Sequence, residues 1–360
     1  MSEARRPLSR RHFLSTSAGA MAAALGAPAF LEAASDKPRV VVASGGAGKD
    51  PREAAYQRLK AATEKLGGFR DLLHGKRVLI KLNATEKKNQ DANTSPGFAA
   101  ALLRLCKEQE PKHIKVIGQE WYGFDCKRKG KPTLREVIQE AGVELEELIH
   151  WWKPSDQYAN RTPKGGGWSQ LWVAKEIFEP DTVLINAPRV KTHAFTLYTG
   201  CVKNCIGLTY HMYAHHCTAD RNPKAGADEN HPARLKGWRL FPAKLSAAYH
   251  EIYGPAVDLN VVDACEPTFG WGGPDPERIR TFQAHKTIVS RDGVAADAVG
   301  MALLHDQEPK LIPTALDDWT KGESIYVKNN LTKGNYLAEC HKLGAGQADL
   351  EKIQVDEITI

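Results

Sequence analysis

Short runs of apolar residues alternate with helix-like segments along most of the chain. The apolar runs are 39–44, 77–82, about 113–118, 182–186, 259–262 and 287–290, and the helical patterns are 52–66, about 97–109, about 134–148 and about 294–304. Strands that are apolar throughout are buried on both faces, as in parallel sheets covered by helices. The sequence therefore predicts an α/β fold, with a mostly parallel sheet flanked by helices in a Rossmann-like three-layer arrangement.

The first 35 residues have the order of an export signal. Arginine pairs at 5–6 and 10–11 precede an Ala-rich run over about 17–31, and small residues follow at 33–35. The run is too short to span a bilayer and is typical of a removable signal peptide. The segment SRRHFL at 9–14 resembles a twin-arginine signal. We expect the twin-arginine translocase as a partner during export, a periplasmic or extracytoplasmic location and no stable membrane anchor. The alternative is a basic amphipathic helix.

The charge of the remaining chain gives no reason to expect nucleic acid as a partner. The full sequence has 49 Lys and Arg against 43 Asp and Glu, and residues 1–35 contribute four Arg and two Glu. The remaining 45 basic and 41 acidic residues are not gathered into the basic face that nucleic acid requires. We expect residues 36–360 to form a single large α/β domain.

Seven cysteines follow the signal, and their pairing stays open. An oxidising compartment permits disulfides, but an odd number leaves at least one thiol unpaired. The chain has no CxxC motif, so no iron–sulfur cluster is expected. Cys201 and Cys205 would share a helix face, as buried thiols, metal ligands or a redox pair.

Polar residues interrupt or follow two of the predicted strands. Ligands of open α/β sheets bind beyond the carboxyl ends of the strands. Lys81 interrupts the run VLIKLN, Asn83 ends it, and Thr94 follows in a nearby loop. A buried lysine is costly without a partner, which favours a binding role for these three residues. The alternative for Lys81 is an edge-strand position with its charge in water.

A second strand end is richer in polar residues. The segment NAPRVKTH at 186–193 is followed by TGCVKNCIGL at 199–208, in which small and apolar residues separate the polar ones. This mixture indicates a partly buried site. Candidate binding residues are Lys191, Thr199 and Asn204, joined by Asp263 at the end of the run NVVD.

Two residues of this second region are candidates for catalysis. His193 has a side chain suited to proton transfer near neutral pH, and Lys203 can neutralise an anionic substrate or cofactor. Farther on, His215 and His216 are donors suited to a transition metal.

The chain resembles the family named domain of unknown function 362. The resemblance rests on VLIKLN with a downstream Thr-x-Pro, VLINAPRVKTH, TGCVKNCIGL, VVDA with GGP, and SRDGVAADAVG, in that order over about 77–305. Some relatives carry ferredoxin-like segments, which this chain lacks. The family name implies no reaction.

A more distant similarity is to the amino-terminal domain of lactate racemase-like nickel-pincer enzymes. In both, a Lys follows a Pro/His segment by about ten residues, as Lys203 follows His193. The similarity implies His193 as acid/base, Lys203 as tether of a nickel-bearing cofactor, and His215 or His216 as nickel ligand. The chain departs from that pattern, because Cys201-Val202 stand where the racemases have glycines and Ile206-Gly207 where they have Pro-Gly.

The sequence thus leaves three functional interpretations. The first is an exported enzyme that acts on a small anionic substrate or cofactor held by Lys and His residues. We expect a cofactor- or metal-dependent enzyme of the isomerase or racemase class, with an oxidoreductase as the alternative class. The second is a non-catalytic periplasmic protein that binds an anion or a metal. The third is structural, with Lys203 and Asn204 satisfying buried carbonyl groups at a strand-to-helix turn.

Overall fold

The fold was analysed in a computed structural model of the chain. The structure describes residues 37–48, 50–86, 89–119, 122–148, 156–168, 170–193, 196–210, 232–270, 279–310, 312–321 and 334–360. The predicted signal at 1–35 and the candidate ligands His215 and His216 lie outside these residues. No helix in the described part is long and apolar enough to cross a bilayer.

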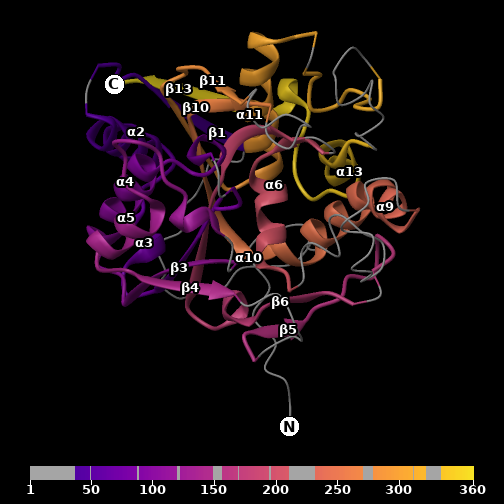
Figure 1. The fold of residues 1–360 in the computed structure, drawn as a ribbon, viewed down its shortest axis with the longest axis horizontal. Coiled ribbons are helices and arrows are strands. Elements are labelled where there is room, and N and C mark those ends of the chain that lie inside the picture. Colours follow the sequence, from indigo (N-terminus) through magenta and orange to yellow (C-terminus); the bar gives the residue numbers. More distant parts are fainter. Residues whose placement is uncertain are drawn as a thin grey trace, which may run out of the picture.

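One large sheet organises the molecule (Figure 1). Its main path runs in the order β13 (Gln354–Thr359), β1 (Arg39–Ser44), β12 (Lys286–Ser290), β10 (Val257–Phe269), β7 (Thr182–Ala187), β2 (Arg77–Leu82), β3 (His113–Gln119) and β4 (Glu144–Leu148). Three further strands extend it: β8 (Arg189–His193) and β11 (Arg280–Thr281) pair with β10, and β9 (Leu197–Thr199) pairs with β8. A separate pair is formed by β5 (Tyr158–Asn160) and β6 (Trp172–Ala174).

Most of the neighbouring strands on the main path run in the same direction. The pairs from β10 through β7, β2 and β3 to β4 are parallel, as is the pair β1–β13. Strand β12 is antiparallel to both of its neighbours, β1 and β10. The carboxyl ends of β10, β7 and β2 therefore meet at one edge of the sheet.

Helices cover both faces of the sheet, which confirms the predicted three-layer fold. One face packs against α2 (Pro51–Lys65), α3 (Arg70–Leu73), α4 (Pro96–Lys107) and α5 (Leu134–Glu140). The other packs against α6 (Cys201–Asn204), α9 (Pro232–Ala248), α11 (Gly293–Gln307) and α13 (Tyr336–Lys342). The two groups lie on opposite sides of the sheet in Figure 1, with the short α10 (Gly254–Ala256) leading into β10.

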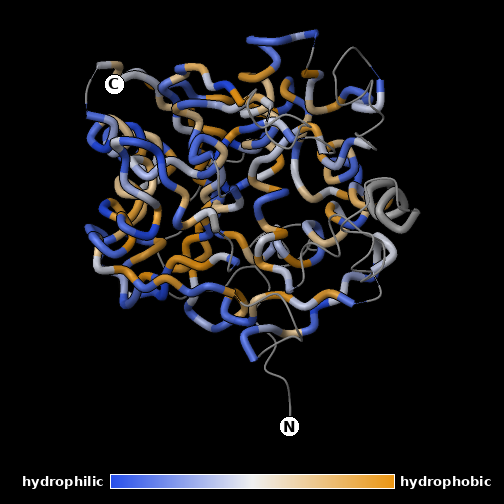
Figure 2. The backbone as a smooth tube through the Cα atoms, viewed as in Figure 1, coloured by the Kyte–Doolittle hydropathy of each residue, from blue (hydrophilic) through white to orange (hydrophobic). Residues whose placement is uncertain are grey.

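The alternation of side chains along each strand builds the two cores. In β1, for example, Val40 and Val42 pack on the α6 side, whereas Val41 and Ala43 pack on the α4 side. Successive residues of a strand face opposite sides of the sheet, so an apolar run supplies both cores at once. Figure 2 shows that the helices around the sheet carry both hydrophilic and hydrophobic residues.

The predicted helix over 134–148 is wrong in its second half. Helix α5 ends at Glu140, and 144–148 form the edge strand β4. Gly142 lies between them with φ +62°, a left-handed conformation that commonly follows the end of a helix. The helical pattern continued past this glycine because Leu145 and Leu148 are spaced as on a helix face.

Candidate functional site

Three neighbouring strands place polar side chains at the same level of the sheet. Lys81 of β2 pairs with Asn186 of β7, which pairs with Asn260 of β10. All three side chains lie on the α6 face, since they follow the alternation of Leu79, Leu184 and Val262. Lys81 is only 4% exposed and lies on a central strand, so the edge-strand alternative is wrong.

Helix α6 rests on this polar row through Asn204. The Asn204 amide Nδ2 donates to the Lys81 carbonyl at 3.1 Å and to Asn186 Oδ1 at 2.8 Å. The Asn186 amide in turn donates to the carbonyl of Cys201, also on α6, at 2.9 Å. Asn204 thus satisfies a buried carbonyl, which agrees with the structural interpretation for this one residue.

Four asparagines from different elements form one continuous series of hydrogen bonds, here called the asparagine chain. It runs Lys191 Nζ to Asn83 Oδ1 (2.7 Å), Asn83 Nδ2 to Asn204 Oδ1 (3.1 Å), Asn204 Nδ2 to Asn186 Oδ1 (2.8 Å), Asn186 Nδ2 to Asn260 Oδ1 (2.9 Å) and Asn260 Nδ2 to the Ser290 carbonyl (3.4 Å). The chain joins α6 to four strands and ends at the side chain of Lys191.

The hairpin β8–β9 brings three predicted site residues to one face. Lys191 pairs with Thr199, and His193 pairs with Leu197 two positions along. Directly opposed residues of an antiparallel pair share a face, as do residues two apart in a strand. The side chains of Lys191, His193 and Thr199 therefore lie on the same side of the hairpin.

The hydroxyl of Thr199 is buried, with no hydrogen-bond partner among the described residues. Thr199 is 2% exposed, and within the described part of the chain its Oγ1 makes no hydrogen bond. A buried hydroxyl that makes no hydrogen bond costs free energy. Its position opposite Lys191 makes it the group best placed to bond a polar atom of a ligand.

Positive charge is concentrated around Lys191. Burial lowers the pKa of Lys191 well below its usual value, and the charges of Lys203, Arg189 and Lys81 lower it further, while Glu86 acts in the opposite direction. Burial also lowers the pKa of Lys81 to about 8. These shifts describe a buried region with a net positive field.

Gly207 leaves room for the Lys81 side chain. A Cβ at Gly207 would lie 2.8 Å from Lys81 Cε and 2.9 Å from Nζ. The lysine amine donates to the carbonyl of Leu82 at 2.6 Å. The glycine in the segment CIGL is therefore required by the close approach of this lysine.

Lys115 is another buried lysine of this fold, and carboxylates of the protein itself balance its charge. Although burial acts to lower it, the pKa of Lys115 is raised above its usual value by hydrogen bonds to Glu146, Glu176 and Glu144. The distances from its amine to these carboxylates are 2.7, 2.9 and 3.1 Å. Around Lys191, by contrast, Lys203, Arg189 and Lys81 act to lower the pKa and Glu86 acts to raise it, while Arg189 has a carboxylate partner of its own in Glu266 at 3.7 Å.

Thr94 and Asp263 bond the backbone around the site. Thr94 Oγ1 accepts from the Asn83 N–H and donates to the Ala187 carbonyl, both at 2.9 Å. Asp263 Oδ2 accepts from the N–H of Ser95, the first residue before α4, at 2.8 Å. The structure thus gives both residues a supporting role at the strand ends, and ligand contact by them stays a prediction.

Sequence reasoning missed two residues that shape the site. Arg189 donates to the carbonyls of Asn93 and Glu266 and to Thr268, and it fastens β8 to β10 and to the loop after β2. The signal for this residue is its place two positions before Lys191 in a segment that is otherwise small or apolar.

The second missed residue is Asp297, on α11. Its carboxylate accepts from the N–H groups of Cys201 at 2.5 Å and Val202 at 2.9 Å, and a Cβ at Gly200 would lie 2.1 Å from it. Burial raises the pKa of Asp297 to about 7, although the two N–H groups act to lower it. The sequence feature that could have identified Asp297 is its position as an aspartate inside the apolar helix GVAADAVG.

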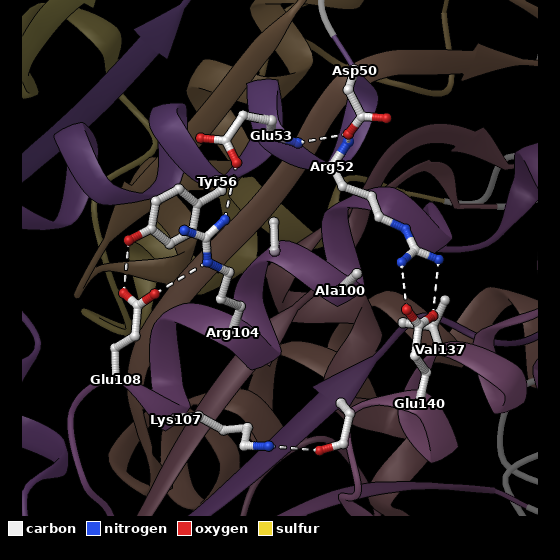
Figure 3. A pocket seen from close by; sticks show the side chains of 12 residues that line it. Asp50, Arg52, Glu53, Tyr56, Ala100, Arg104, Lys107, Glu108, Val137 and Glu140 are labelled. Atoms are coloured by element: carbon white, nitrogen blue, oxygen red, sulfur yellow. Dashed lines mark hydrogen bonds and ion pairs between the residues drawn. The ribbon is translucent and has the colours of Figure 1, made fainter.

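A cleft of the described surface lies away from these residues (Figure 3). It has a volume of about 420 Å³ and lies among α2, α4 and α5. Its arginines already have carboxylate partners, since Arg52 pairs with Glu140 and Arg104 pairs with Glu53 and Glu108. Charges that neutralise one another in this way leave little attraction for an anion.

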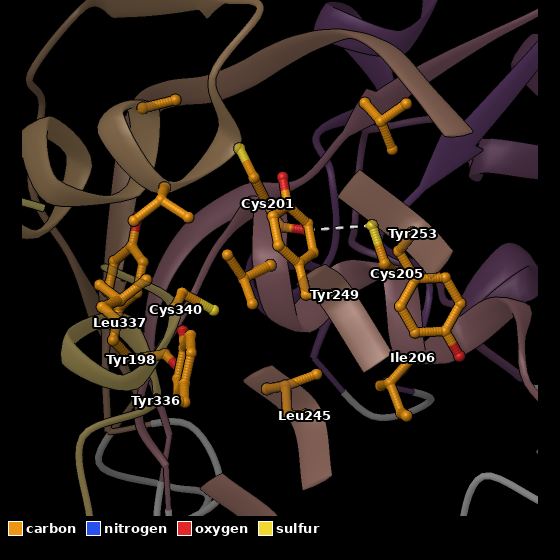
Figure 4. Close-up of a cluster of buried hydrophobic side chains, with 14 of the residues drawn as sticks. Tyr198, Cys201, Cys205, Ile206, Leu245, Tyr249, Tyr253, Tyr336, Leu337 and Cys340 are labelled. Atoms are coloured by element: carbon orange, nitrogen blue, oxygen red, sulfur yellow. Dashed lines mark hydrogen bonds between the residues drawn. The ribbon is translucent and has the colours of Figure 1, made fainter. Parts of the chain in front are cut away.

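Six cysteines are described, and all six are free thiols. Cys201, Cys205 and Cys340 lie in the apolar cluster behind α6 (Figure 4), where Cys205 Sγ donates to the Cys201 carbonyl. Burial raises the pKa of each of these three thiols. Of the three interpretations of Cys201 and Cys205, the structure agrees with buried thiols. The seventh cysteine, Cys217, lies outside the described residues.

These buried thiols are expected to resist alkylation in the folded protein. The reactive species is the thiolate, which burial disfavours. Iodoacetamide at pH 8 followed by peptide mass spectrometry should leave Cys201, Cys205 and Cys340 unmodified, and denaturant should make them react. Rapid labelling of any of the three in the folded protein would contradict their burial.

Metal ligation receives no support within the described residues. There, no three His, Cys, Asp or Glu side chains lie close enough together to hold a metal ion. The described residues therefore do not fit a nickel or other metal centre by themselves, and no step is derived through one. Ligation by His215 and His216 stays a prediction.

Comparisons with known proteins give a family and a weak structural likeness. The family model described as a domain of unknown function (DUF362) matches residues 78–302. A crystal structure of a Thermotoga maritima protein, a structural-genomics target, is similar at 15% sequence identity with a TM-score of 0.43. The match covers 73% of this chain and 60% of that one, so the chain spans only about three fifths of the solved protein. No curated protein matches the sequence.

Proposed function

Because the chain belongs to the DUF362 family, whose description assigns no reaction, we propose a function from the site itself: an exported enzyme that binds a small anionic molecule at the strand ends of β2 and β7. The observation that carries the proposal is the group of basic side chains around the buried Lys191, beside a Thr199 hydroxyl that makes no hydrogen bond within the described residues. An anion would neutralise the first and bond the second.

The energetics of burial support an anionic ligand. Like charges in a region of low dielectric destabilise the fold unless a counter-charge reduces their repulsion. Lys191 lies within electrostatic range of Lys203, Arg189 and Lys81. Preorganised charges stabilise an anion without reorganising, so a bound anion would reduce the repulsion among these basic side chains.

The reaction class that this arrangement serves is proton transfer next to a carboxylate. His193 shares the hairpin face with Lys191 and Thr199. Its imidazole would take the proton from the carbon next to the carboxylate, and the electron pair of that C–H bond would move into an enolate. The lysines would stabilise the enolate charge, and return of a proton to carbon would complete an isomerisation or racemisation.

A more specific version of this proposal is that Lys203 is the covalent attachment point of a cofactor, as in the racemase-like enzymes. Lys203 lies at the end of α6, close enough to Lys191 to affect its charge, and it is 7% exposed. A covalent tether would remove one positive charge from this cluster. Intact mass of the protein isolated from its host tests the tether directly.

Export through the twin-arginine pathway belongs to the same proposal. Its support is the sequence of residues 1–35, with the Arg10-Arg11 pair followed by Phe13 and Leu14. The remaining chain would then work in the periplasm or outside the cytoplasm.

Hydrogen exchange from solvent into small acids tests the proposed reaction without knowledge of the substrate. The protein is incubated in D₂O with a panel of 2-hydroxy acids, and deuterium at the carbon next to the carboxylate is followed by NMR. We expect exchange with at least one acid, reduced by about 100-fold or more in His193→Gln.

Two results would redirect this proposal. Thermal stabilisation by sulfate or by an acid without any exchange would favour the non-catalytic binding protein. Absence of both stabilisation and exchange would overturn the anion site itself. Arg52→Gln, at the cleft in Figure 3, is the control that should leave both measurements unchanged.

A further inference from the structure

Helix α6 depends on another helix for the hydrogen bonds of its first turn. It has only four residues, and Gly200 at its N-cap carries no side chain that could accept a hydrogen bond. The first N–H groups of a helix have no partner within the helix, and a helix this short is unstable without outside contacts. Asp297 of α11 supplies the acceptor, because its carboxylate bonds the N–H groups of Cys201 and Val202. The segment over 199–203, here called the β9–α6 turn, is therefore fixed by a residue of a distant helix.

Asp297 lies on a face of α11 that approaches this turn closely. Gly293 is four positions before Asp297 and Gly300 is three positions after it, so all three share one face of the helix. A Cβ at Gly293 would lie 2.2 Å from the Tyr249 hydroxyl, and a Cβ at Gly300 would lie 2.5 Å from the Tyr198 hydroxyl. The two glycines are therefore required by close packing, which brings α11 near enough for Asp297 to reach α6. Figure 4 shows both tyrosines in the apolar cluster around Cys201.

The N–H groups that Asp297 bonds lie between two residues of the proposed anion site. Thr199 comes two positions before Cys201, and Lys203 directly follows Val202. The β9–α6 turn therefore carries one candidate binding group on each side of the bonded atoms. The Asp297 carboxylate is fully buried and bonds backbone N–H groups, so it can act on the site only through the backbone.

We propose that Asp297 is a positioning residue, which fixes the β9–α6 turn so that Thr199 and Lys203 are held in place for an anionic ligand. Binding groups must be held within about 0.5 Å of their productive geometry, and buried hydrogen bonds behind them provide this support. The inference rests on the proposed anion site for its purpose, whereas the effect of Asp297 on the turn can be measured without a ligand.

The N-cap of α5 provides a matched reference on the other face of the sheet. Thr133 is 4% exposed, and its hydroxyl accepts from the Glu136 N–H at 3.1 Å. Its loss, like that of Asp297, removes an acceptor from the first turn of a helix. Helix α5 packs on the sheet face opposite to α6, so Thr133→Val should lower stability without affecting the β9–α6 turn.

Hydrogen exchange of the turn tests the effect of Asp297 without a ligand. In Asp297→Asn one of the two hydrogen bonds is lost, and the peptide over 199–204 is expected to exchange about tenfold faster than in the wild type. Thr133→Val should leave this peptide unchanged and speed exchange at the start of α5. The measurement is made by mass spectrometry at pH 8, above the pKa of about 7 to which burial raises Asp297, so that the wild-type carboxylate is charged.

Sulfate affinity at the same pH tests the positioning role itself. A residue that only adds stability would leave the affinity of the folded protein unchanged. We expect Asp297→Asn to lower sulfate affinity by about tenfold, as does loss of the hydrogen-bond partner behind a metal-ligating side chain, and Thr133→Val to leave it unchanged. Removal of a negative charge would by itself strengthen anion binding, so a weaker affinity cannot come from the change in charge. Isothermal titration calorimetry at a temperature where all variants are folded measures these affinities.

Gly300→Ala tests the same role with the carboxylate intact. The added methyl group would lie 2.5 Å from the Tyr198 hydroxyl and should push the β9–α6 turn away from α11. That hydroxyl makes no hydrogen bond within the described residues, so Tyr198→Phe makes room without breaking one. We expect Gly300→Ala to weaken sulfate binding and Gly300→Ala/Tyr198→Phe to restore part of it. This pair of variants decides the matter if Asp297→Asn does not fold, and unchanged affinity in a folded Gly300→Ala protein would then overturn the positioning role.

The two proposals fail in different ways. Unchanged exchange over 199–204, or unchanged sulfate affinity in a folded Asp297→Asn protein whose wild type binds sulfate, would overturn the positioning role. Equal effects of Asp297→Asn and Thr133→Val on both measurements would also overturn it, because they would report stability alone. Faster exchange of the turn in a protein that binds no sulfate would overturn the proposed function and leave the effect of Asp297 on the turn intact.

Discussion

Replacing Lys203 by methionine is expected to weaken binding of the anionic ligand by about 100-fold or more, at a modest cost in stability. Removing one partner of a buried, hydrogen-bonded charge pair costs about 2–5 kcal/mol of binding free energy. In the free protein, however, the substitution also removes repulsion between Lys203 and Lys191. Isothermal titration calorimetry and urea unfolding measure the two effects separately.

Lys115→Met is the control and should give the reverse result. Lys115 and Lys203 have the same exposure, 7%, but Lys115 neutralises three carboxylates. Its loss leaves those carboxylates uncompensated and should cost about 3–5 kcal/mol of stability, with ligand affinity unchanged. Equal effects of the two substitutions on affinity would show that neither lysine belongs to a binding site.

The second large effect concerns the pH dependence of stability through Asp297. Its pKa is raised to about 7 in the folded protein, from an ordinary value of 3.8. Between these two values the folded state binds more protons than the unfolded state, so stability falls as the pH rises. The loss is fully developed above about pH 7 and amounts to at most about 4 kcal/mol.

Asp297→Asn should remove this dependence. The amide oxygen can still accept from one N–H of α6, but the second bond is lost, which lowers stability equally at every pH. The expected result is a flatter profile between pH 4.5 and 7.5 in urea unfolding, relative to the wild type. Asp318→Asn is the control, because the pKa of Asp318 is lowered to about 2 and its contribution changes only below about pH 4. Parallel wild-type and Asp297→Asn profiles would contradict the raised pKa.

Sequence patterns were sufficient to predict the features of individual strands. The run VLIKLN identified a buried strand with a lysine in it, and the segment around Lys191 and His193 identified a second strand end with polar groups. Both predictions depend only on neighbours in sequence and on the rule that ligands of parallel sheets bind at the carboxyl ends.

Pairings across the sheet could not be predicted in the same way. The apolar run of β12 has the same pattern in either direction, so its antiparallel orientation left no signal. The asparagine chain joins residues between 18 and 121 positions apart, and each asparagine alone looks like an ordinary strand end or turn residue. The register of β7 and β10 aligns Asn186 with Asn260, and Asn83 is joined to them through Asn204 of α6.

The position of β1 in the sheet has a consequence for the order of folding. Its two neighbours, β12 and β13, lie more than 240 residues farther along the chain, and the N–H of Ile360 bonds the carbonyl of Ser44. A ribosome makes this strand first, yet neither of its partners exists until more than 240 further residues have been made. Closing so long a loop makes this pairing a slow, late step. The first strand of the sheet is therefore expected to be among the last to be fixed.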